Sequence, residues 1–156
     1  MSLRAALTAL AALDVPGVTL SSPLDALPDR LAPDHLPALL ILPGDPYGAR
    51  RAFDADDGLR ALTFGRTADS IVVHITHALL VVPAAAPFSQ RRAVPRIVDL
   101  IDAYTAALAT DLTLGGALAR PAHITLAPDT FVYAGIAYRG CLFRHTWVLI
   151  PAAPAP

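Results

Sequence analysis

Four of the five histidines and the single cysteine of this 156-residue chain are the candidates for holding a metal ion: His74, His77, His123, His145 and Cys141. His74 and His77 lie in a run dense in β-branched residues, which predicts a strand. Because residues three apart on a strand point to opposite faces, these two cannot chelate one ion together. Cys141 and His145 share a face, but four residues of strand separate them by roughly 13 Å. We therefore expect no metal site, and expect histidines that are hydrogen-bonded or at the surface.

A nucleophilic site would combine Cys141 with one of the histidines and Asp129. Nothing beside the cysteine indicates a helix N-terminus that would activate the thiol, and a cysteine followed by Leu142 and Phe143 is typical of a small core residue. The sequence has no Gly-x-Ser-x-Gly motif, phosphate-binding loop or dinucleotide fingerprint. We therefore predict no catalytic residue and no cofactor.

Charge limits the classes of partner. All 12 basic residues are arginines, all 13 acidic residues are aspartates, and the net charge is −1. A general nucleic-acid-binding protein needs an excess of positive charge, so we expect no sequence-specific contact with nucleic acid. A local basic patch and passive contact with DNA stay open. One cysteine excludes an intramolecular disulfide, as is usual in a reducing cytoplasm.

Two groups of charged side chains are candidates for interfaces. The first stands near the start of an expected helix, where positive charge opposes the helix dipole, and is either a solvated end or a docking patch for an acidic partner or passing DNA. The second stands in a polar loop from Pro43 to Gly58, and is either a solvated tip or a set of ion pairs between neighbouring subunits. The first group is Arg91, Arg92 and Arg96; the second is Arg50, Arg51, Asp54, Asp56 and Asp57.

An amphipathic helix precedes the most β-rich part of the chain. Pro95 is tolerated only in a first turn, so the helix is predicted to begin near Val94 rather than with Ser89 as its cap. It should end near Asp111, before two glycines that allow the chain to reverse. The apolar residues spaced by three and four predict its buried face: Val94, Ile97, Val98, Ile101, Tyr104 and Leu108.

Three β-rich runs follow the glycines. They are Ala122–Leu126, Phe131–Tyr138 and Cys141–Ile150. Arg139 and Gly140 lie between the last two runs, and we predict a tight hairpin turn there.

The first half of the chain predicts one helix and three strands. A helix capped by Ser2 should place Leu3, Leu7 and Leu10 in the core, which fits this segment better than a secretory signal. A proline-spaced surface connector follows. The predicted strands are Ala38–Leu42 in the centre of the sheet, and Leu59–Phe64 paired as a hairpin with Ile71–Val82. The histidines and prolines of Ser70–Gln90 argue against a membrane span.

Together these elements predict an α+β fold, in which two principal helices pack on one face of a mainly antiparallel sheet. Residues 1–150 are expected to form a single domain, and the proline-rich residues 151–156 a flexible tail. The composition is 54% hydrophobic and 16% charged, against about 45–50% and about 25% in typical soluble domains. This excess predicts that the chain self-associates through an apolar face.

Four short motifs follow one another in the second half of the chain: Leu100-Ile101-Asp102-Ala103-Tyr104, Ala107-Leu108-Ala109-Thr110-Asp111, Leu114-Gly115-Gly116, and Tyr138-Arg139-Gly140 in the closing strands. In this order they resemble the tail-terminator and tail-completion (head–tail joining) proteins of long-tailed bacteriophages and prophages. The resemblance is clearest over residues 94–150 and weaker at Leu36–Gly44, where the family has a proline-led apolar strand.

The resemblance implies a non-enzymatic structural protein of the virion, assembled in the bacterial cytoplasm. Its expected partners are further copies of itself in a ring, with six subunits expected, the tail tube protein and a head–tail connector protein. The ring would cap the head-proximal end of the tail tube, stop its polymerisation and provide the head-attachment surface. A neck or head-completion connector and a minor tail protein are alternatives in the same class. A small cytoplasmic enzyme or ligand-binding domain is the alternative from another class.

Overall fold

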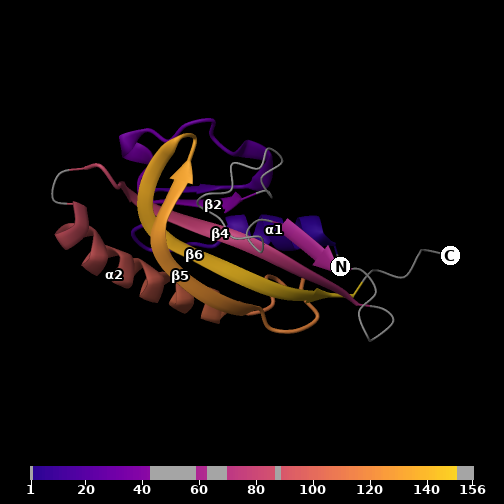
Figure 1. Cartoon of the computed structure of the whole chain (residues 1–156). Coiled ribbons are helices and arrows are strands. Elements are labelled where there is room, and N and C mark those ends of the chain that lie inside the picture. The colour runs from indigo at the N-terminus through magenta and orange to yellow at the C-terminus, as the bar shows by residue number, and fades with distance from the viewer. Residues whose placement is uncertain (1, 43–58, 63–69, 87–88, 151–156) are drawn as a thin grey trace.

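The structure is a computed structural model that describes residues 2–42, 59–62, 70–86 and 89–150. One mixed sheet of six strands carries two α-helices, and two short 3-10 helices lie between the first strands (Figure 1). The elements in chain order are α1 (Leu3–Ala11), β1 (Leu20–Ser22), η1 (Leu24–Ala26), η2 (Pro33–His35), β2 (Ala38–Leu42), β3 (Leu59–Leu62), β4 (Ile71–Pro83), α2 (Ser89–Thr110), β5 (His123–Tyr133) and β6 (Ile136–Leu149). Within the described residues, no helix is long and apolar enough to cross a membrane.

Strand β4 organises the sheet, whose order is β1-β2-β4-β6-β5. Strand β6 pairs along one edge of β4, while β2 and β3 pair with successive parts of the other edge. All of these pairs are antiparallel, and only β1 and β2 run parallel. This arrangement confirms the central strand predicted at Ala38–Leu42, and it confirms the antiparallel pairing of Leu59–Leu62 with β4.

Helix α1 forms where the sequence predicts it. The Ser2 side chain accepts a hydrogen bond from the backbone N–H of Ala5, which satisfies one of the free donors at the helix start. Leu10 and Ala6 are fully buried, and Leu3 and Leu7 are partly buried against the same cluster. The helix is therefore held by one apolar stripe.

Helix α2 begins five residues earlier than predicted. It starts at Ser89, so Pro95 lies inside it rather than in its first turn. A proline there removes the hydrogen bond to the carbonyl four residues earlier and disfavours a helix by roughly 3 kcal/mol. Apolar packing outweighs this cost, because five side chains of the helix are buried: Ala93, Ile97, Leu100, Tyr104 and Leu108.

The buried face of α2 is also rotated from the prediction. Ile97, Tyr104 and Leu108 are buried as expected, but Val94 and Val98 are 54% and 51% exposed. Ala93 and Leu100 take their place in the core. The apolar spacing of three and four therefore identifies the helix, but the buried stripe is centred between Ala93, Leu100 and Tyr104 rather than on the two valines.

The turn after α2 is built by the residues that end the helix. Leu114, Gly115 and Gly116 have φ values of 51°, 67° and 75°, all in the left-handed region. The Asp111 carboxylate accepts the backbone N–H of Gly115, and Leu114 points into the core, where it is 2% exposed. Leu114, Gly115 and Gly116 therefore reverse the chain after the helix, and the Asp111 carboxylate and the buried Leu114 side chain hold this backbone in place.

Strands β5 and β6 form one long hairpin, which corrects two predictions. The three β-rich runs are two strands, and the turn is not at Arg139 and Gly140, because both lie within β6. The chain reverses instead at Ala134 and Gly135, whose φ values are 50° and 78°. Tyr133 pairs with Ile136 across this two-residue loop. Positive φ at both central residues identifies a type I′ turn, whose twist matches that of paired strands.

Gly140 serves a close approach between strands rather than a turn. An added Cβ would lie 1.8 Å from the carbonyl oxygen of Leu79 on β4. The register between β4 and β6 shifts beside this point, between Leu80 and Val82. A glycine within a strand often marks such a bulge, where the backbones come together.

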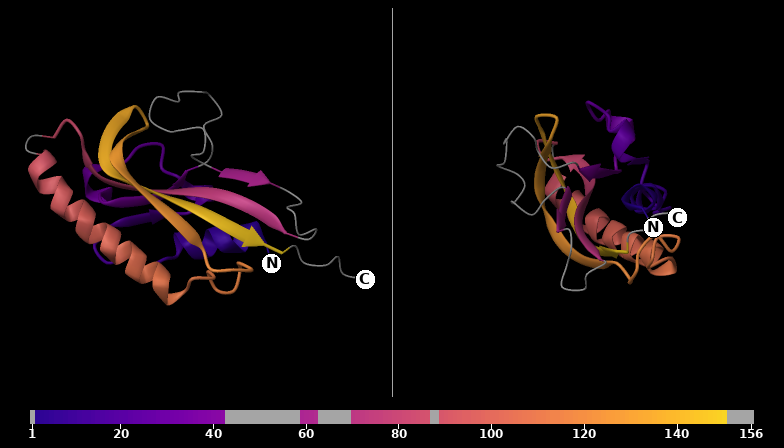
Figure 2. Two further views of the ribbon diagram at one scale, coloured as in Figure 1. Left: turned by 60° about the horizontal axis from the view of Figure 1, so that its bottom comes forward. Right: turned by 90° about the vertical axis from the view of Figure 1, so that its right-hand side faces the viewer.

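The two faces of the sheet bury separate cores. Both helices pack on the same face (Figure 2), as predicted, and share a cluster that includes Tyr104, Phe143 and Trp147. On the other face, Phe131 and Tyr138 of the curled hairpin pack with Leu31 of the proline-spaced connector. The hairpin tip lies beside that connector in Figure 1, and the Tyr133 hydroxyl donates to the carbonyl of Pro28. The fold is α+β.

We predict that Gly140→Ala destabilises the protein by roughly 3 kcal/mol or more, because the new methyl group would overlap backbone rather than a mobile side chain. Gly115→Ala is the matched control: it has open space for a methyl group but a positive φ, so its cost should be about 1 kcal/mol. Urea unfolding of both variants measures the difference. Equal costs would show that the approach of β4 to Gly140 is not a tight constraint.

Candidate functional site

The structure separates the predicted interface residues. Arg50, Arg51, Asp54, Asp56 and Asp57 lie outside the described residues. Arg91, Arg92 and Arg96 are exposed near the start of α2. At about 100° per residue, Arg92 and Arg96 lie on one side of the helix and Arg91 is turned away from them. The three arginines therefore do not form a single patch on one face.

The cysteine site that the sequence suggested is not assembled. Cys141 is fully buried on the helix-bearing face, where burial raises the pKa of its thiol to about 11. Asp129 pairs with Gly140, the neighbour of Cys141, so its side chain lies on the opposite face. Among the described residues, no group of three or more histidine, cysteine or acidic side chains is placed to hold a metal ion.

The histidines of β4 behave as strand geometry requires. His74 lies 3.3 Å from the Thr146 hydroxyl on one face of the sheet. His77 lies on the other face, fully buried beneath α2. The expectation that these two do not act together is confirmed.

A buried polar cluster links α2 to the two central strands. It consists of His77 on β4, Tyr104 on α2, and His145 and Trp147 on β6, each no more than 1% exposed. The Tyr104 hydroxyl lies 3.0 Å from Nδ1 of His77 and 2.7 Å from Nε2 of His145. The Trp147 indole N–H donates to Nδ1 of His145 at 3.3 Å.

The donors fix the direction of this chain of hydrogen bonds. An indole N–H can only donate, so Nδ1 of His145 accepts and the proton of the neutral ring is on Nε2. That Nε2–H donates to the Tyr104 oxygen, which leaves the tyrosine O–H to donate to Nδ1 of His77. His77 therefore carries its proton on Nε2. This atom is buried and has no hydrogen-bond partner among the described residues.

Burial keeps every group in the cluster neutral. It lowers the pKa of His77 and of His145 to about 3, from an ordinary value of 6.5, and the neighbouring His145 lowers the pKa of His77 further. It also raises the pKa of Tyr104 well above its usual value. The tyrosine ring stacks on Phe143 with centroids 3.6 Å apart and an angle of 10° between the planes. The cluster can thus orient and hold α2 while solvent is excluded from it.

Reasoning from the sequence did not find this cluster. It compared His74 with His77 and Cys141 with His145, which are pairs within one strand. His77 and His145 lie on different strands and share a face because His77 pairs with Phe143 and His145 pairs with Ile75. The available signal was a tyrosine on the apolar face of the helix, since a buried hydroxyl requires a partner.

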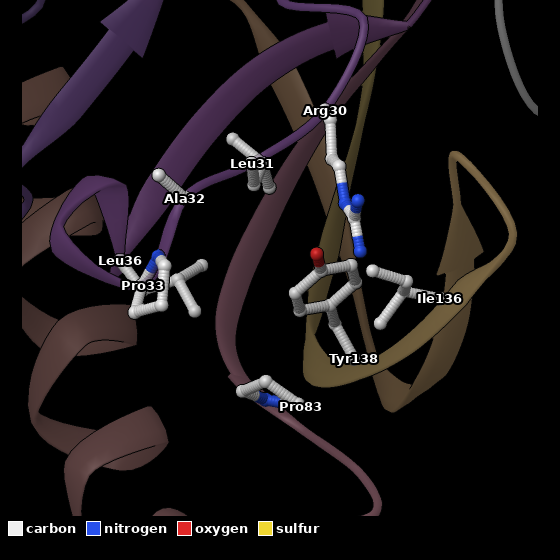
Figure 3. Close-up of a pocket in the computed structure, with 8 residues that line it drawn as sticks. All are labelled: Arg30, Leu31, Ala32, Pro33, Leu36, Pro83, Ile136 and Tyr138. Carbon is white, nitrogen blue, oxygen red and sulfur yellow. The ribbon is translucent and has the colours of Figure 1, made fainter.

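A surface pocket lies on the opposite side of the sheet. Its volume is about 430 Å³, within the range of small-molecule sites. Its lining is mainly apolar, and Arg30 and Tyr138 supply a guanidinium and a phenol group. In Figure 3 the Arg30 side chain points toward Tyr138 and Ile136, across from Pro33 and Leu36. Such a pocket could take a small apolar molecule with an acidic group.

Comparison with known proteins assigns no family to this chain. No protein-family model matches the sequence, and a search of curated proteins found no match.

We predict that acid destabilises the fold through His77 and His145. Between pH 6.5 and about 3, the unfolded chain binds protons at these histidines that the folded chain does not bind, so stability falls as the pH falls. Each histidine should contribute roughly 1 kcal/mol per pH unit. Urea unfolding at pH values from about 7 down to about 5, above the range where most aspartates titrate, measures this loss.

His77→Asn retains an acceptor at the position of Nδ1 for Tyr104 and removes one titrating ring, so it should roughly halve the loss of stability with pH. His123→Gln, at an exposed position, should leave the loss unchanged. A wild-type stability that is constant over this range would contradict the assignment of both histidines as buried and neutral.

Proposed function

We propose that the protein is a structural component of a phage or prophage tail that forms a ring on the head-proximal end of the tail tube. In this role it ends tube polymerisation and presents a surface to the head. It acts without catalysis, in association with further copies of itself, the tube protein and a head–tail connector. Its place in the mature particle is the tail, after assembly in the bacterial cytoplasm.

The observation that carries this proposal is that three of the four family-like motifs form one continuous structural unit. The first two motifs span the second half of α2 and contribute its buried residues Leu100, Tyr104 and Leu108, and the third is the reversal that Asp111 caps. This reversal delivers the chain to β5. Motifs of this kind are packing and turn signals, and here each one performs a packing or turn role.

The fourth motif departs from the expected role. Tyr138-Arg139-Gly140 lies within β6, where Tyr138 packs in the second core and Gly140 admits the backbone of β4. It therefore supports the proposal less than the other three. The ring and its six subunits rest on the resemblance alone.

The proposed mechanism is physical. A tube grows because each added ring exposes the face that binds the next ring, a head-to-tail contact that does not close by itself. A terminating ring matches that face on one side and offers a different surface on the other. Arg92 and Arg96, which share one side of α2, are candidates for contact with an acidic partner surface.

The pocket at Arg30 and Tyr138 favours a second candidate function, a small ligand-binding domain. It provides the apolar walls and the few polar groups of such a site. This function requires no ring and no tube, so the state of assembly separates the two candidates.

We predict that native mass spectrometry detects a discrete ring, several times the 16.3 kDa chain mass, in the free protein or on addition of the tube protein. Electron microscopy of tubes polymerised with the protein should show uniform lengths capped at one end. Arg92→Asp with Arg96→Asp should weaken capping if these arginines contact the partner, whereas Asp14→Asn, at an exposed site in the loop after α1, should not. A monomer or dimer that is indifferent to the tube would contradict the proposal and favour the ligand-binding alternative.

A further inference from the structure

Four of the large apolar side chains that the structure describes as exposed lie on only two elements. They are Val94 and Val98 on α2, and Leu126 and Val132 on β5, each 45–54% exposed. Single exposed apolar residues are ordinary, but a contiguous group often marks an interaction surface.

The orientation of α2 places the two valines toward β5. Leu100 points to the loop that follows α1, since a Cβ added at Gly17 in that loop would lie 3.2 Å from its Cδ2. At about 100° per residue, Val94 and Val98 lie on the opposite flank of the helix from Leu100, with Ile97 between them. They face away from α1, and on that side the sheet continues through β6 to its outer strand, β5.

The two side chains of β5 point to the same side of the sheet as the helices. The register of β5 with β6 is continuous from His123 to Tyr133, so side chains alternate without interruption. Phe131 packs in the core of the opposite face, which places Leu126 and Val132 on the helix-bearing face. All four exposed side chains therefore lie on the helix-bearing side of the sheet, and we call this set the α2–β5 strip: Val94, Val98, Leu126 and Val132.

Charged residues flank the valines in a self-complementary order. Arg91 and Asp102 are both exposed and, from the helical period, lie on the same flank of α2 as Val98. Arg91 precedes the valines and Asp102 follows them. Reversing the direction of the helix about a point near residues 96–97 exchanges Arg91 with Asp102 and Val94 with Val98. Such a surface is complementary to a second copy of itself.

We propose that the α2–β5 strip is the docking site for a second copy of this chain, related by a two-fold axis that passes near residues 96–97 of α2. The two helices run antiparallel, and Arg91 of each copy pairs with the partner's Asp102. Val94 packs against the partner's Val98, and the partner's helix covers Leu126 and Val132.

The size of the α2–β5 strip is suitable for binding a second copy of the chain. With the axis near residues 96–97, residues 89–104 of the two helices meet over about 24 Å, and the exposed apolar side chains of β5 widen the contact toward the roughly 800 Å² per partner of a stable interface. Direct pairing of the β5 edges is less suitable, because Pro128 in the middle of that strand lacks an N–H to donate. The contact therefore uses side chains on the face of the sheet rather than its edge.

This inference does not rest on the proposed ring. A ring of identical subunits needs only head-to-tail contacts, whereas a two-fold contact joins copies in pairs. The two-fold contact gives a dimer of the free chain, and sedimentation velocity measures that dimer whether or not a ring forms.

A charge swap on the full chain tests the proposal by sedimentation velocity over a concentration series. Arg91→Asp and Asp102→Arg should each weaken pairing by about tenfold or more, because each replaces two attractions across the axis with two repulsions. The double variant R91D/D102R restores both attractions with reversed sign and should pair within a few-fold of the wild type.

Asp14→Arg and Asp129→Arg are charge-reversal controls that should leave pairing unchanged, because Asp14 is exposed in the loop after α1 and Asp129 is exposed on the opposite face of the sheet. Circular dichroism checks that every variant is folded. A wild-type chain that stays monomeric at about 100 μM would overturn the proposal. So would a double variant that pairs no better than the single variants, or control variants that weaken pairing equally.

Discussion

The position of α2 on the sheet depends on the hydroxyl group of Tyr104. It bridges one histidine on each of the two central strands, while the tyrosine ring stacks on Phe143 between them. Apolar packing alone would let a helix slide or rotate at small cost, because hydrophobic contact is not directional. Hydrogen bonds are directional, and inside a dry core an unmade one is expensive. The cluster therefore selects one rotation of α2 among several that would bury a similar apolar area.

This rotation has consequences at both ends of the helix. It brings Ala93 and Leu100 into the core, so that Val94 and Val98 lie outside. It also places Asp111 where its carboxylate accepts a backbone hydrogen bond in the reversal at Leu114 to Gly116, which leads into β5. The surface that we propose for self-association thus follows from the way the buried face is fixed. The composition, with 54% hydrophobic residues, is consistent with such an uncovered surface.

Local patterns predicted much of this fold. A serine before an apolar helix, a continuous apolar strand at Ala38–Leu42 and a β-branched run at β4 each carry their own signal, and each forms as expected. The errors arose where tertiary contacts override local preference. Pro95 is tolerated within α2 because the helix is anchored further along, and Gly140 is required by a strand remote in sequence. The turn at Ala134 and Gly135 was missed because alanine rarely adopts a positive φ.

The same limit applies to the candidate site. Sequence spacing can relate residues on one element, as it did for His74 and His77, but the cluster joins His77, Tyr104 and His145 from three elements. Their proximity depends on the register between β4 and β6, which has no local signal. The candidate interface residues of the polar loop fall outside the described part of the chain, and of the basic residues near the start of α2 only Arg91 lies on the flank that carries the valines.

The most direct test of this account is the stability of Tyr104→Phe, which keeps the ring and its stacking but removes the hydroxyl. Urea unfolding at neutral pH should show a loss of roughly 2–4 kcal/mol, because Nδ1 of His77 and Nε2 of His145 both lose their partner in the core. Tyr133→Phe removes a single half-buried hydrogen bond and should cost about 1 kcal/mol. If Tyr104→Phe costs no more than Tyr133→Phe, packing alone fixes the helix and the central role of the hydroxyl is wrong.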